Sequence, residues 1–413
     1  MEVLGKAVAV TATCALLAAC GGGPGGGGGK VSDDKIVLAV LNDQSGVYAD
    51  LSGKSSVTAV EMAVADWKAR HGDDAVTTNI EVVSVDHQNK PDIANSKAQE
   101  LYDRQRADVI LDVPTSSAAL AVANVAKSKK KIFMDVGAAT TALEGEQCNK
   151  YTFHYGYNTY MLANGTGATV TRDGAKNWYL VYPDYAFGQD MEASFTDAVT
   201  GAGGSIVRSD PAPFPNDNFS TFLLKAPGLT PKPQVIGTMQ AGGDLVNLVK
   251  QYNEYRLRDK GIGLAVGLMF ITDIHSLGPD ALAGTKFTDR WYWNASPENR
   301  AWADEFQAKA GKRPSFPNAA NYSAATQYLD AVQRAGTDGS DAVVKELEGH
   351  TFSDAFAKNG TIRAEDHLLT HDVSLAQVKP KSEVTEPWDY EKILDTIPAA
   401  EAFQPVSTDC AMG

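Results

Sequence analysis

The chain alternates between short apolar runs and longer segments whose apolar residues recur every three or four positions. Runs such as Lys131–Val136 are apolar at most positions, which is typical of parallel strands that helices cover on both faces. The longer segments carry polar residues on one side and predict amphipathic helices. Because strand and helix alternate along most of the chain, the pattern favours a doubly wound α/β fold.

The series of elements occurs twice, and each series predicts one Rossmann-like lobe. The expected strands are Lys35–Leu41, Asn79–Asp86, Asp108–Asp112, Lys131–Val136, Asn177–Pro183, Ser205–Ser209, Gln234–Met239, Leu264–Ile271 and Phe287–Trp293. The expected helices among them are Ser52–Arg70, Asp92–Arg106, Ala118–Ser128, Phe187–Ala202 and Asp244–Arg256. Further helices at Pro297–Lys309, Tyr322–Ala335 and Asp341–Leu347 follow, and then a late strand at Asp372–Val378.

Elements that come after both series imply that the chain crosses back between the lobes, so that several strands form the hinge. We expect a first lobe of residues 35–157 plus about 295–350. The second lobe then takes residues 158–294 plus about 351–390, and residues 391–413 form a C-terminal tail.

The N-terminus has the features of a secretion signal. Lys6 precedes an apolar run, Ala7–Ala19, that is too short to span a bilayer and fits the core of a signal peptide. The junction Leu17-Ala18-Ala19-Cys20 resembles the lipobox of bacterial lipoproteins, in which cleavage leaves a lipid-modified Cys20. We therefore expect residues 1–20 to be a lipoprotein signal and the Gly-rich residues 21–34 to be a flexible tether. A plain secretory signal with an incidental cysteine is the alternative.

Charge and cysteine usage narrow the function further. A formal net charge of −14 argues against a nucleic-acid-binding surface, because phosphate binding needs clustered Lys and Arg. Once the signal is removed and Cys20 is lipidated, Cys148 and Cys410 remain. In an oxidising compartment these two cysteines are expected to form a disulfide, with two free thiols as the alternative.

Three loops carry a resemblance to a known family. Asn42–Tyr48 follows the first strand, Val113–Ser117 precedes a helix, and Gly137–Thr140 follows the strand that ends at Val136. In these loops the mature chain resembles the type I periplasmic binding proteins of the leucine/isoleucine/valine-binding family. The resemblance implies a non-enzymatic, two-lobed solute-binding subunit of an ABC importer, with a permease and an ATPase as partners and no cofactor or metal. It also implies a monomer outside the cytoplasm that closes around a small molecule.

The same loops lie beyond the carboxyl ends of strands, where open α/β sheets bind ligands. Thr115–Ser117 lead into a helix, so their hydroxyls and the free amides of the first turn suit an anion such as a carboxylate. A simple helix cap is the alternative for Ser117. The candidate ligand-binding residues of the first lobe are Ser45, Tyr48, Thr115, Ser116, Ser117, Ala138, Ala139 and Thr140.

Aromatic residues dominate the candidates in the second lobe. Tyr182–Gln189 resembles a turn of the family in which an aromatic ring covers the ligand, and Tyr185 or Phe187 is the candidate ring. Gln240 follows another strand and is expected to face the cleft. Packing in the core is the alternative for the two rings.

One position departs from the family pattern. Amino-acid binders of the family hold the ligand's ammonium with an acidic residue, and Phe270 stands at that position here. A phenyl ring cannot pair with a buried ammonium, although Asp273 could do so if the alignment is shifted. We therefore predict a ligand without an α-amino group, an aromatic or aliphatic carboxylate.

Two further functions remain open. The sequence contains no Gly-x-Ser-x-Gly, His-Glu-x-x-His or strand-placed Gly-x-Gly-x-x-Gly motif of an enzyme. His367 and His371 have a spacing that suits a metal if the segment is helical, but a strand is expected there. A lipid-anchored sensor that reports ligand to a signalling partner is the other alternative.

Overall fold

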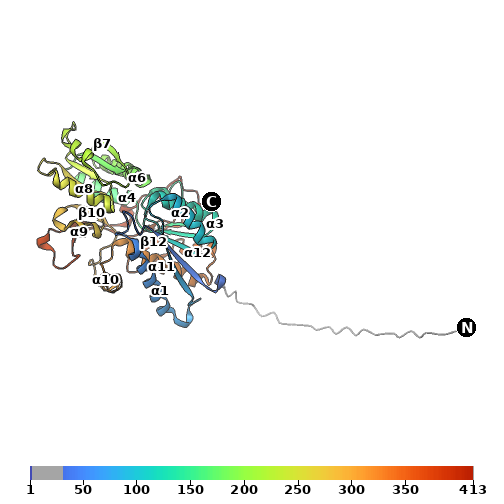
Figure 1. Cartoon of the computed structure of the whole chain (residues 1–413). Helices are drawn as coiled ribbons and strands as arrows, with labels where there is room; N and C mark the ends of the chain where they lie inside the picture. Colours follow the sequence, from blue (N-terminus) through green and yellow to red (C-terminus); the bar gives the residue numbers. More distant parts are fainter. Residues whose placement is uncertain (2–30, 413) are drawn as a thin grey trace.

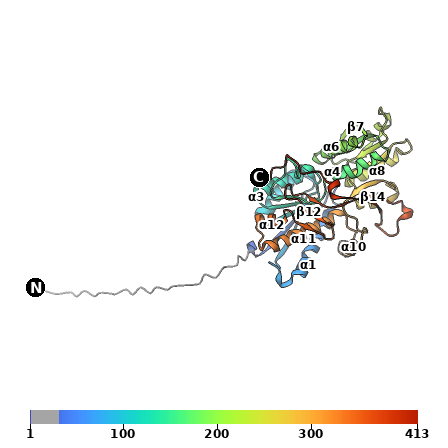
Figure 2. The ribbon, with the colours of Figure 1, turned by 180° about the vertical axis from the view of Figure 1, so that it is seen from behind.

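The computed structural model describes Met1 and residues 31–412. Two α/β lobes lie side by side, and the view from behind shows the same division (Figures 1 and 2). The predicted signal peptide, Cys20 and residues 21–30 of the tether lie outside the described residues. Among the described residues, no helix has the length and apolar character needed to cross a bilayer.

The first lobe is built on a five-stranded parallel sheet in the order β2-β1-β3-β4-β5. Its strands are β1 (Ile36–Asn42), β2 (Ile80–Asp86), β3 (Val109–Asp112), β4 (Ile132–Asp135) and β5 (Thr152–His154). The helices α1 (Gly53–His71), α2 (Pro91–Asp103) and α3 (Ser116–Lys129) connect them.

Strand β1 shows why its sequence is apolar at every position from Ile36 to Leu41. Ile36, Leu38 and Val40 pack into the core on one face of the sheet, and Val37, Ala39 and Leu41 pack into a separate core on the other. All six side chains are therefore removed from water, which is the main stabilising contribution to such a strand.

The second lobe repeats the plan with a four-stranded parallel sheet in the order β7-β6-β8-β9. Its strands are β6 (Asn177–Pro183), β7 (Ser205–Ala212), β8 (Val235–Thr238) and β9 (Gly263–Val266). Its helices include α6 (Ala186–Gly201), α7 (Ser220–Lys225), α8 (Gly242–Glu254) and α9 (Ile271–Leu277). The predicted fold class, two doubly wound lobes, is confirmed.

Some predicted elements differ from the structure. The strand expected at Leu264–Ile271 ends at Val266, and α9 begins at Ile271. The break falls at Gly267, where a Cβ atom would lie 2.6 Å from Met191 Cε and 2.7 Å from Met239 Sδ. Both atoms lie towards the flexible ends of methionine side chains, which would have to move for a larger residue, and the apolar run is divided between a strand and a helix at this contact.

The first segment of the second lobe is helical, which the sequence did not indicate. It runs through α4 (Thr159–Leu162), a π-helical turn (Ala163–Ala168) and α5 (Thr169–Arg172). Cβ atoms at Gly165 and Gly167 would meet Thr288 and the ring of Phe195. The glycines that weaken the helical pattern are therefore required by packing.

After the second sheet the chain returns to the first lobe. Helices α10 (Pro297–Ala310), α11 (Phe316–Ala335) and α12 (Ser340–Leu347) follow β10 (Lys286–Asp289). Helix α11 packs against α1, and Trp67 Nε1 donates to Asp330 Oδ1 at 2.8 Å.

The small sheet of β11 (Thr351–Phe352), β12 (Gly360–Ile362) and β13 (Leu369–Thr370) also contacts the first lobe, because His154 N donates to His367 O at 3.1 Å. Strand β14 (Val373–Val378) then pairs antiparallel with β10 on one side and with β15 (Glu391–Ile397) on the other. The chain therefore passes between the two sheets three times: after β5, after β10 and after β13.

The C-terminal tail returns to the first lobe beyond the short helix α13 (Ala399–Ala402). A disulfide joins Cys148 to Cys410 across 262 residues of sequence, which confirms the predicted pairing. Between α13 and Cys410, the carbonyl oxygen of Gln404 accepts from Arg363 Nη1 at 2.7 Å, which fixes this part of the tail.

Candidate functional site

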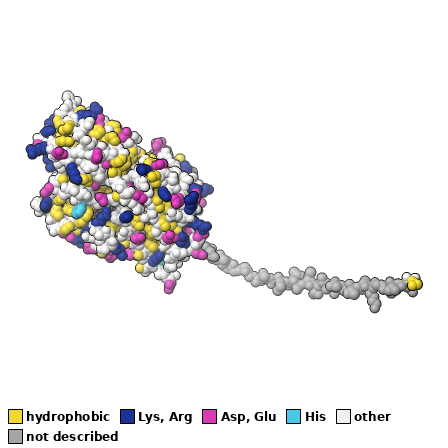
Figure 3. All heavy atoms as spheres, viewed as in Figure 1, with side chains coloured by type: hydrophobic (Ala, Val, Ile, Leu, Met, Phe, Trp, Pro, Cys, Tyr) yellow, Lys and Arg dark blue, Asp and Glu magenta, His cyan; other side chains and the backbone are white. Residues whose placement is uncertain are grey.

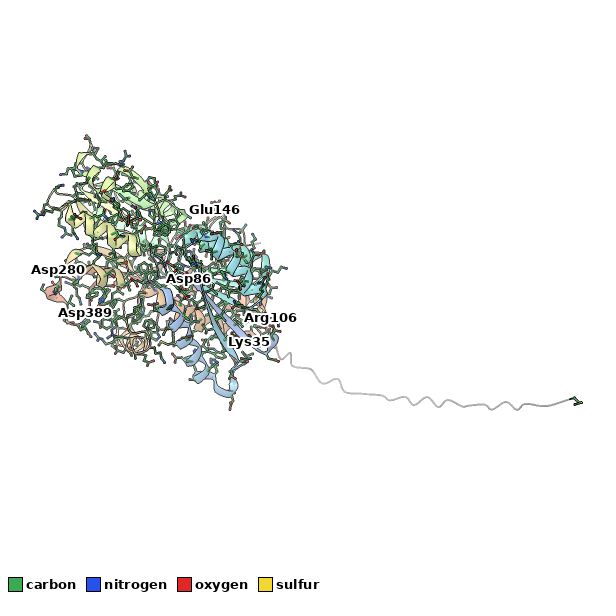
Figure 4. The ribbon with its side chains drawn as sticks, viewed as in Figure 1. Lys35, Asp86, Arg106, Glu146, Asp280 and Asp389 are labelled. Carbon is green, nitrogen blue, oxygen red and sulfur yellow. A yellow bond between two sulfur atoms is a disulfide. The ribbon has the colours of Figure 1, made fainter. Side chains whose placement is uncertain are left out.

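The carboxyl ends of the first sheet face the second lobe. Figure 4 shows Asp86, the last residue of β2, towards the middle of the molecule, whereas Lys35 and Arg106, at the amino ends of β1 and β3, lie at the far end. Loops that follow the strands therefore meet between the lobes, which is where this type of sheet binds ligands.

A narrow cavity with a volume of about 10 Å³, room for about one water molecule, lies at this meeting point, so a larger molecule fits there only when the lobes or the lining side chains move apart. Five of its nine lining side chains are aromatic, and the others are aliphatic or proline. The lining residues are Tyr48, Leu51, Pro114 and Tyr157 from the first lobe and the hinge, and Tyr185, Phe187, Ala241, Leu268 and Phe270 from the second lobe. Four predicted residues are thus brought together: Tyr48, Tyr185, Phe187 and Phe270.

Sequence reasoning missed Leu51, Pro114, Tyr157, Ala241 and Leu268. Tyr157 lies in the first crossing between the lobes, and its hydroxyl donates to the carbonyl oxygen of Gly137 at 2.9 Å. No strand-loop-helix pattern marks a hinge segment. The only available signal was its aromatic character beside Gly156, where a Cβ atom would lie 1.8 Å from the carbonyl oxygen of Val136.

Four long helices begin at the edge of the cavity. Leu51 precedes the cap of α1, Pro114 precedes the cap of α3, and Tyr185 and Ala241 are the caps of α6 and α8. None of these four caps makes a side-chain hydrogen bond to its helix. Except at Gly243 of α8, whose amide is already bonded, the first-turn amides and the positive ends of the helix dipoles therefore favour a negatively charged ligand.

The two lobes are in contact around the cavity. The hydroxyls of Tyr48 and Tyr185 lie 2.6 Å apart, and the ring of Phe214 packs 4.4 Å from that of Tyr185. The amide of Gly243 donates to the carbonyl oxygen of Val47 at 3.1 Å. These bonds join the first lobe to the second and close one side of the cleft.

The hydroxyl-rich loop of the first lobe is buried beside the cavity. Thr115 and Ser116 are each 1% exposed, and Ser117 is half-buried. Thr115 Oγ1 donates to Asn89 Oδ1, and Ser116 Oγ accepts from the amide of Ala139 at 3.5 Å. Helix α3 begins at Ser116, two residues earlier than expected, so Thr115 and not Ser117 is its cap residue. The hydroxyls of Thr115 and Ser116 are bonded to neighbouring loops of the same lobe.

The neighbouring loop is held by backbone and side-chain bonds. The amide of Ala138 donates to Asp135 Oδ1 at 3.3 Å, and the carbonyl oxygen of Ala139 accepts from the amide of Thr159 at 2.9 Å. Thr140 Oγ1 accepts from the amide of Ala142 and caps the next turn. Exposed Ser45 lies further out, where its hydroxyl donates to Asp86 Oδ2 at 2.7 Å.

The buried side chain of His154 contacts this loop. His154 Nδ1 lies 2.5 Å from Glu144 Oε2, and its Nε2 lies 3.1 Å from the carbonyl oxygen of Ala138. Burial lowers the pKa of His154, but the charges of Glu144 and Asp135 outweigh it and raise the pKa to about 9. The imidazole is therefore cationic at neutral pH and can donate from both nitrogens.

In the second lobe, Gln240 is fully buried at the end of β8. Among the described residues, neither its amide nitrogen nor its amide oxygen has a hydrogen-bond partner. It does not line the cavity, although the next residue, Ala241, does. Burying an amide without hydrogen-bond partners costs free energy, and the amide of Gln240 therefore remains able to donate and to accept hydrogen bonds.

Phe270 and Asp273 have different places at the site. The ring of Phe270 lines the cavity and stacks on Phe316 with centroids 5.0 Å apart. Asp273 does not line it, and its Oδ2 accepts from the amide of Phe270 at 2.9 Å, which caps α9. Burial raises the pKa of Asp273 to about 7.

His367 and His371 pack inside the hinge region. His367 stacks on Phe153 with ring centroids 4.1 Å apart. His371 Nε2 accepts from Arg290 Nε at 2.9 Å, and burial, together with the charge of Arg290, lowers the pKa of this imidazole well below its ordinary value. Within residues 31–412, no group of three or more His, Cys, Asp and Glu side chains is placed to hold a metal ion.

Comparisons with known proteins agree with this architecture. A periplasmic binding protein from Burkholderia mallei is 42% identical, with a TM-score of 0.85 over 90% of this chain and 96% of that one. A branched chain amino acid ABC transporter periplasmic ligand-binding protein from Burkholderia xenovorans LB400 is 35% identical, with a TM-score of 0.79 over 91% and 100% of the two chains.

More distant relatives extend the comparison. Leu/Ile/Val-binding protein homolog 6 of Brucella melitensis biotype 1 is 25% identical over 354 residues, which cover 84% of this chain and 88% of the relative. A solute binding protein of an ABC transporter from Rhodopseudomonas palustris BisB5, in complex with 3,4-dihydroxy benzoic acid, is 22% identical with a TM-score of 0.77 over 89% and 98% of the chains. That last likeness shows the fold alone.

The profile of the family described as "Periplasmic binding protein" matches residues 35–383, which is most of the chain. The predicted resemblance to leucine/isoleucine/valine-binding proteins is thereby confirmed. The chain belongs to the periplasmic binding protein family and is an extracytoplasmic solute-binding protein of the kind that serves ABC transporters.

Proposed function

We propose that this protein binds a small organic carboxylate, an aromatic or aliphatic acid, between its lobes and delivers it to an ABC importer. The observation that carries the proposal is the ring-lined cavity at which α1, α3, α6 and α8 begin. Aromatic walls favour a flat or apolar body, and the helix amino ends favour an anionic head.

The two lobes have separate roles in this proposal. The first lobe receives the carboxylate at the amides of α3 and at the hydroxyls of Ser116 and Thr140, and Thr115, whose hydroxyl donates to Asn89, holds the loop in place. Tyr185, Phe187 and Phe270 of the second lobe cover the apolar body of the ligand. Closure excludes water, and the ligand selects the closed state because both lobes contact it only there.

Phe270 supports an acid without an α-amino group. Its ring occupies the cavity wall, and the nearby carboxylate of Asp273 is already used to cap α9. An ammonium in this cavity would have no carboxylate among the lining residues. The dihydroxybenzoic acid bound by the Rhodopseudomonas palustris neighbour supports the same ligand class.

The partners follow from the family. A permease and an ATPase subunit would receive the closed form, the protein would act as a monomer, and no cofactor takes part. Cys20 would anchor the chain to the membrane by its lipid, and the Gly-rich residues 21–30 would give the folded body reach. On the face that Figure 3 shows, Lys and Arg are interspersed with Asp and Glu, which fits a protein that does not bind nucleic acid.

A thermal-shift screen tests the ligand class. Benzoate, 4-hydroxybenzoate, an aliphatic monocarboxylate, leucine and valine are each added to the purified chain. A ligand present at about 100 times its Kd stabilises the native state by about 2.7 kcal/mol, which raises Tm by a few degrees. We expect the acids to raise Tm and the amino acids to leave it unchanged. A rise with leucine or valine alone would show that Phe270 has been misinterpreted.

Two controls separate the remaining functions. Recovery of unchanged ligand after incubation distinguishes binding from catalysis. Reconstitution with the permease and ATPase encoded beside the gene distinguishes an importer subunit from a lipid-anchored sensor, because only the importer couples binding to ATP-dependent uptake.

A further inference from the structure

Asp190 makes a set of hydrogen bonds that joins the two lobes outside the cavity. Its carboxylate accepts from the amide of Thr141 at 2.6 Å, from the hydroxyl of Thr141 at 3.0 Å and from the hydroxyl of Thr159 at 2.8 Å. Ser194, one turn further along α6, donates to Thr159 Oγ1 at 3.1 Å. Every donor to the Asp190 carboxylate is a neutral group of a loop or helix end.

The partners of Asp190 come from both sides of the hinge. Thr141 directly follows Thr140 in the first-lobe loop after β4, whereas Asp190 lies in the second turn of α6 in the second lobe. Thr159 is the first residue of α4, just after the first crossing. Thr141 and Asp190 also line one groove with Glu146, whose position Figure 4 marks between the lobes.

The charge of Asp190 is not neutralised by a basic side chain. Within residues 31–412, no Lys, Arg or His nitrogen lies within 4.0 Å of its carboxylate. Burial raises the pKa of Asp190, and the bonds from Thr141 and Thr159 oppose that rise. Burying the Asp190 carboxylate removes its hydrogen bonds to water, so the bonds from Thr141 and Thr159 must replace them. Hydrogen bonds to an ionised carboxylate are stronger than those between neutral groups.

Asp190 does not line the cavity, but the helix and the loop that it joins both carry residues of the ligand site. The same helix that carries Asp190 begins with the cavity residues Tyr185 and Phe187, and the same loop that carries Thr141 ends the candidate carboxylate site at Thr140. The Thr141 bonds hold that helix of the second lobe and that loop of the first lobe together in the arrangement that the structure shows.

We propose that Asp190 is a closure latch: a positioning residue that sets the stability of the closed state, and thus ligand affinity, by binding Thr141 across the cleft. The proposal rests on the proposed function for its ligand but concerns how tightly that site closes. Because the bonds to Thr141 form only on closure, the latch slows ligand release and leaves the association rate unchanged.

The test compares Asp190→Asn with Asp197→Asn, the same change at an exposed position of the same helix. The amide introduced by Asp190→Asn would place an NH₂ donor among groups that are themselves donors. We expect Asp190→Asn to release whichever compound raised Tm in the screen at least about tenfold faster, with an unchanged association rate. The control should match the wild type, and Tm without ligand should be similar in all three proteins.

A second measurement needs no ligand. Spin labels on E61C in α1 and D259C beyond α8, both exposed positions of different lobes, report the distance between the lobes. Asp190→Asn should move the distance distribution towards longer values, whereas Asp197→Asn should leave it unchanged.

The outcomes separate the latch from the proposed ligand class. If leucine is the ligand, the ligand class is wrong and the latch is still tested with leucine. If the Asp190→Asn variant shows wild-type release and wild-type distance distributions, with and without any ligand that binds, the latch is overturned. A lower Tm without ligand and unchanged release would likewise assign Asp190 a purely structural role and overturn it.

Discussion

Tyr48 and Tyr185 contribute hydroxyls that meet from opposite lobes at 2.6 Å. One hydroxyl donates to the other, so the second phenolic hydrogen is left for another acceptor. Within the described residues this pair makes no further side-chain hydrogen bond. The pair therefore links the lobes and can still donate to an oxygen of the ligand.

Replacing Tyr185 by Phe should weaken ligand binding about three- to tenfold. The change removes one hydrogen bond worth about 1 kcal/mol and keeps the ring that covers the cavity. Calorimetric titration gives the affinity, and Tyr182→Phe, on the neighbouring strand β6, is the matched control. Unchanged or tighter binding by Tyr185→Phe would show that the hydroxyl pair has no part in closure.

His154 predicts how stability depends on pH. Its pKa is about 9 in the folded protein, above the ordinary value of 6.5, so the folded state binds this proton more tightly than the unfolded state. The stabilisation is fully present below about pH 6.5 and is lost as pH rises through about 9. Its upper limit is about 3 kcal/mol.

Urea unfolding at pH 6, 7.5 and 9.5 measures this effect. The wild type should lose free energy of unfolding over that range, and His154→Gln should show a smaller loss. His275→Gln, at a half-buried histidine, serves as the control. Equal pH profiles for the wild type and His154→Gln would refute the assignment of a cationic His154.

At the scale of elements, the start of helix α8 limits how closely the lobes approach. Gly242 has a φ of +56°, and a Cβ atom there would lie 2.4 Å from the carbonyl oxygen of Val47 in the other lobe. At Gly243, by contrast, a Cβ atom would make an ordinary contact, 3.7 Å from Val47 Cβ.

Gly242→Ala should therefore weaken ligand binding at least about tenfold, because the methyl group holds the lobes apart and the residue is strained at positive φ. Gly243→Ala should bind nearly as the wild type does. Small-angle scattering with ligand present should show a larger radius of gyration for Gly242→Ala alone. The same radius and affinity for both variants would contradict this account of closure.

The elements that sequence predicts best are those whose pattern has a single physical cause. Strand β1 is apolar throughout because both faces are covered, and the loops at Thr115 and Thr140 follow strands that the pattern identifies. The apolar run from Leu264 to Ile271 fits either a strand or a helix. Its division falls near Gly267, which packs against Met191 and Met239, residues that lie far away in the sequence.

The candidate site was predicted unevenly for the same reason. Tyr48, Tyr185, Phe187 and Phe270 follow strand ends and could be found from local pattern. Tyr157 lies in a hinge segment whose place depends on both lobes, and no local signal marks it. Asp273 caps α9 by accepting from the amide of Phe270. This role depends on where α9 begins, which the apolar run did not indicate.

At the scale of the whole molecule, the disulfide ties the C-terminal tail to the first lobe. Cys410→Ser should lower the free energy of unfolding by about 2–5 kcal/mol, because the bond closes a long loop in the unfolded chain. It should also expose residues 399–412 to limited proteolysis. The wild type in reductant should behave as the variant does, and the variant should not respond to reductant. A variant as stable and as protease-resistant as the oxidised wild type would contradict this role.

The central claim is that two hinged lobes hold a small organic carboxylate, an aromatic or aliphatic acid, between them at the cavity among Tyr48, Tyr185, Phe187 and Phe270. Calorimetric titration of the wild type and Phe270→Ala with 4-hydroxybenzoate and with leucine tests it most directly. We predict one molecule of 4-hydroxybenzoate bound per chain, weakened at least about tenfold by Phe270→Ala, and no heat from leucine beyond dilution. Saturable binding of leucine with none of the aromatic acid would contradict the account.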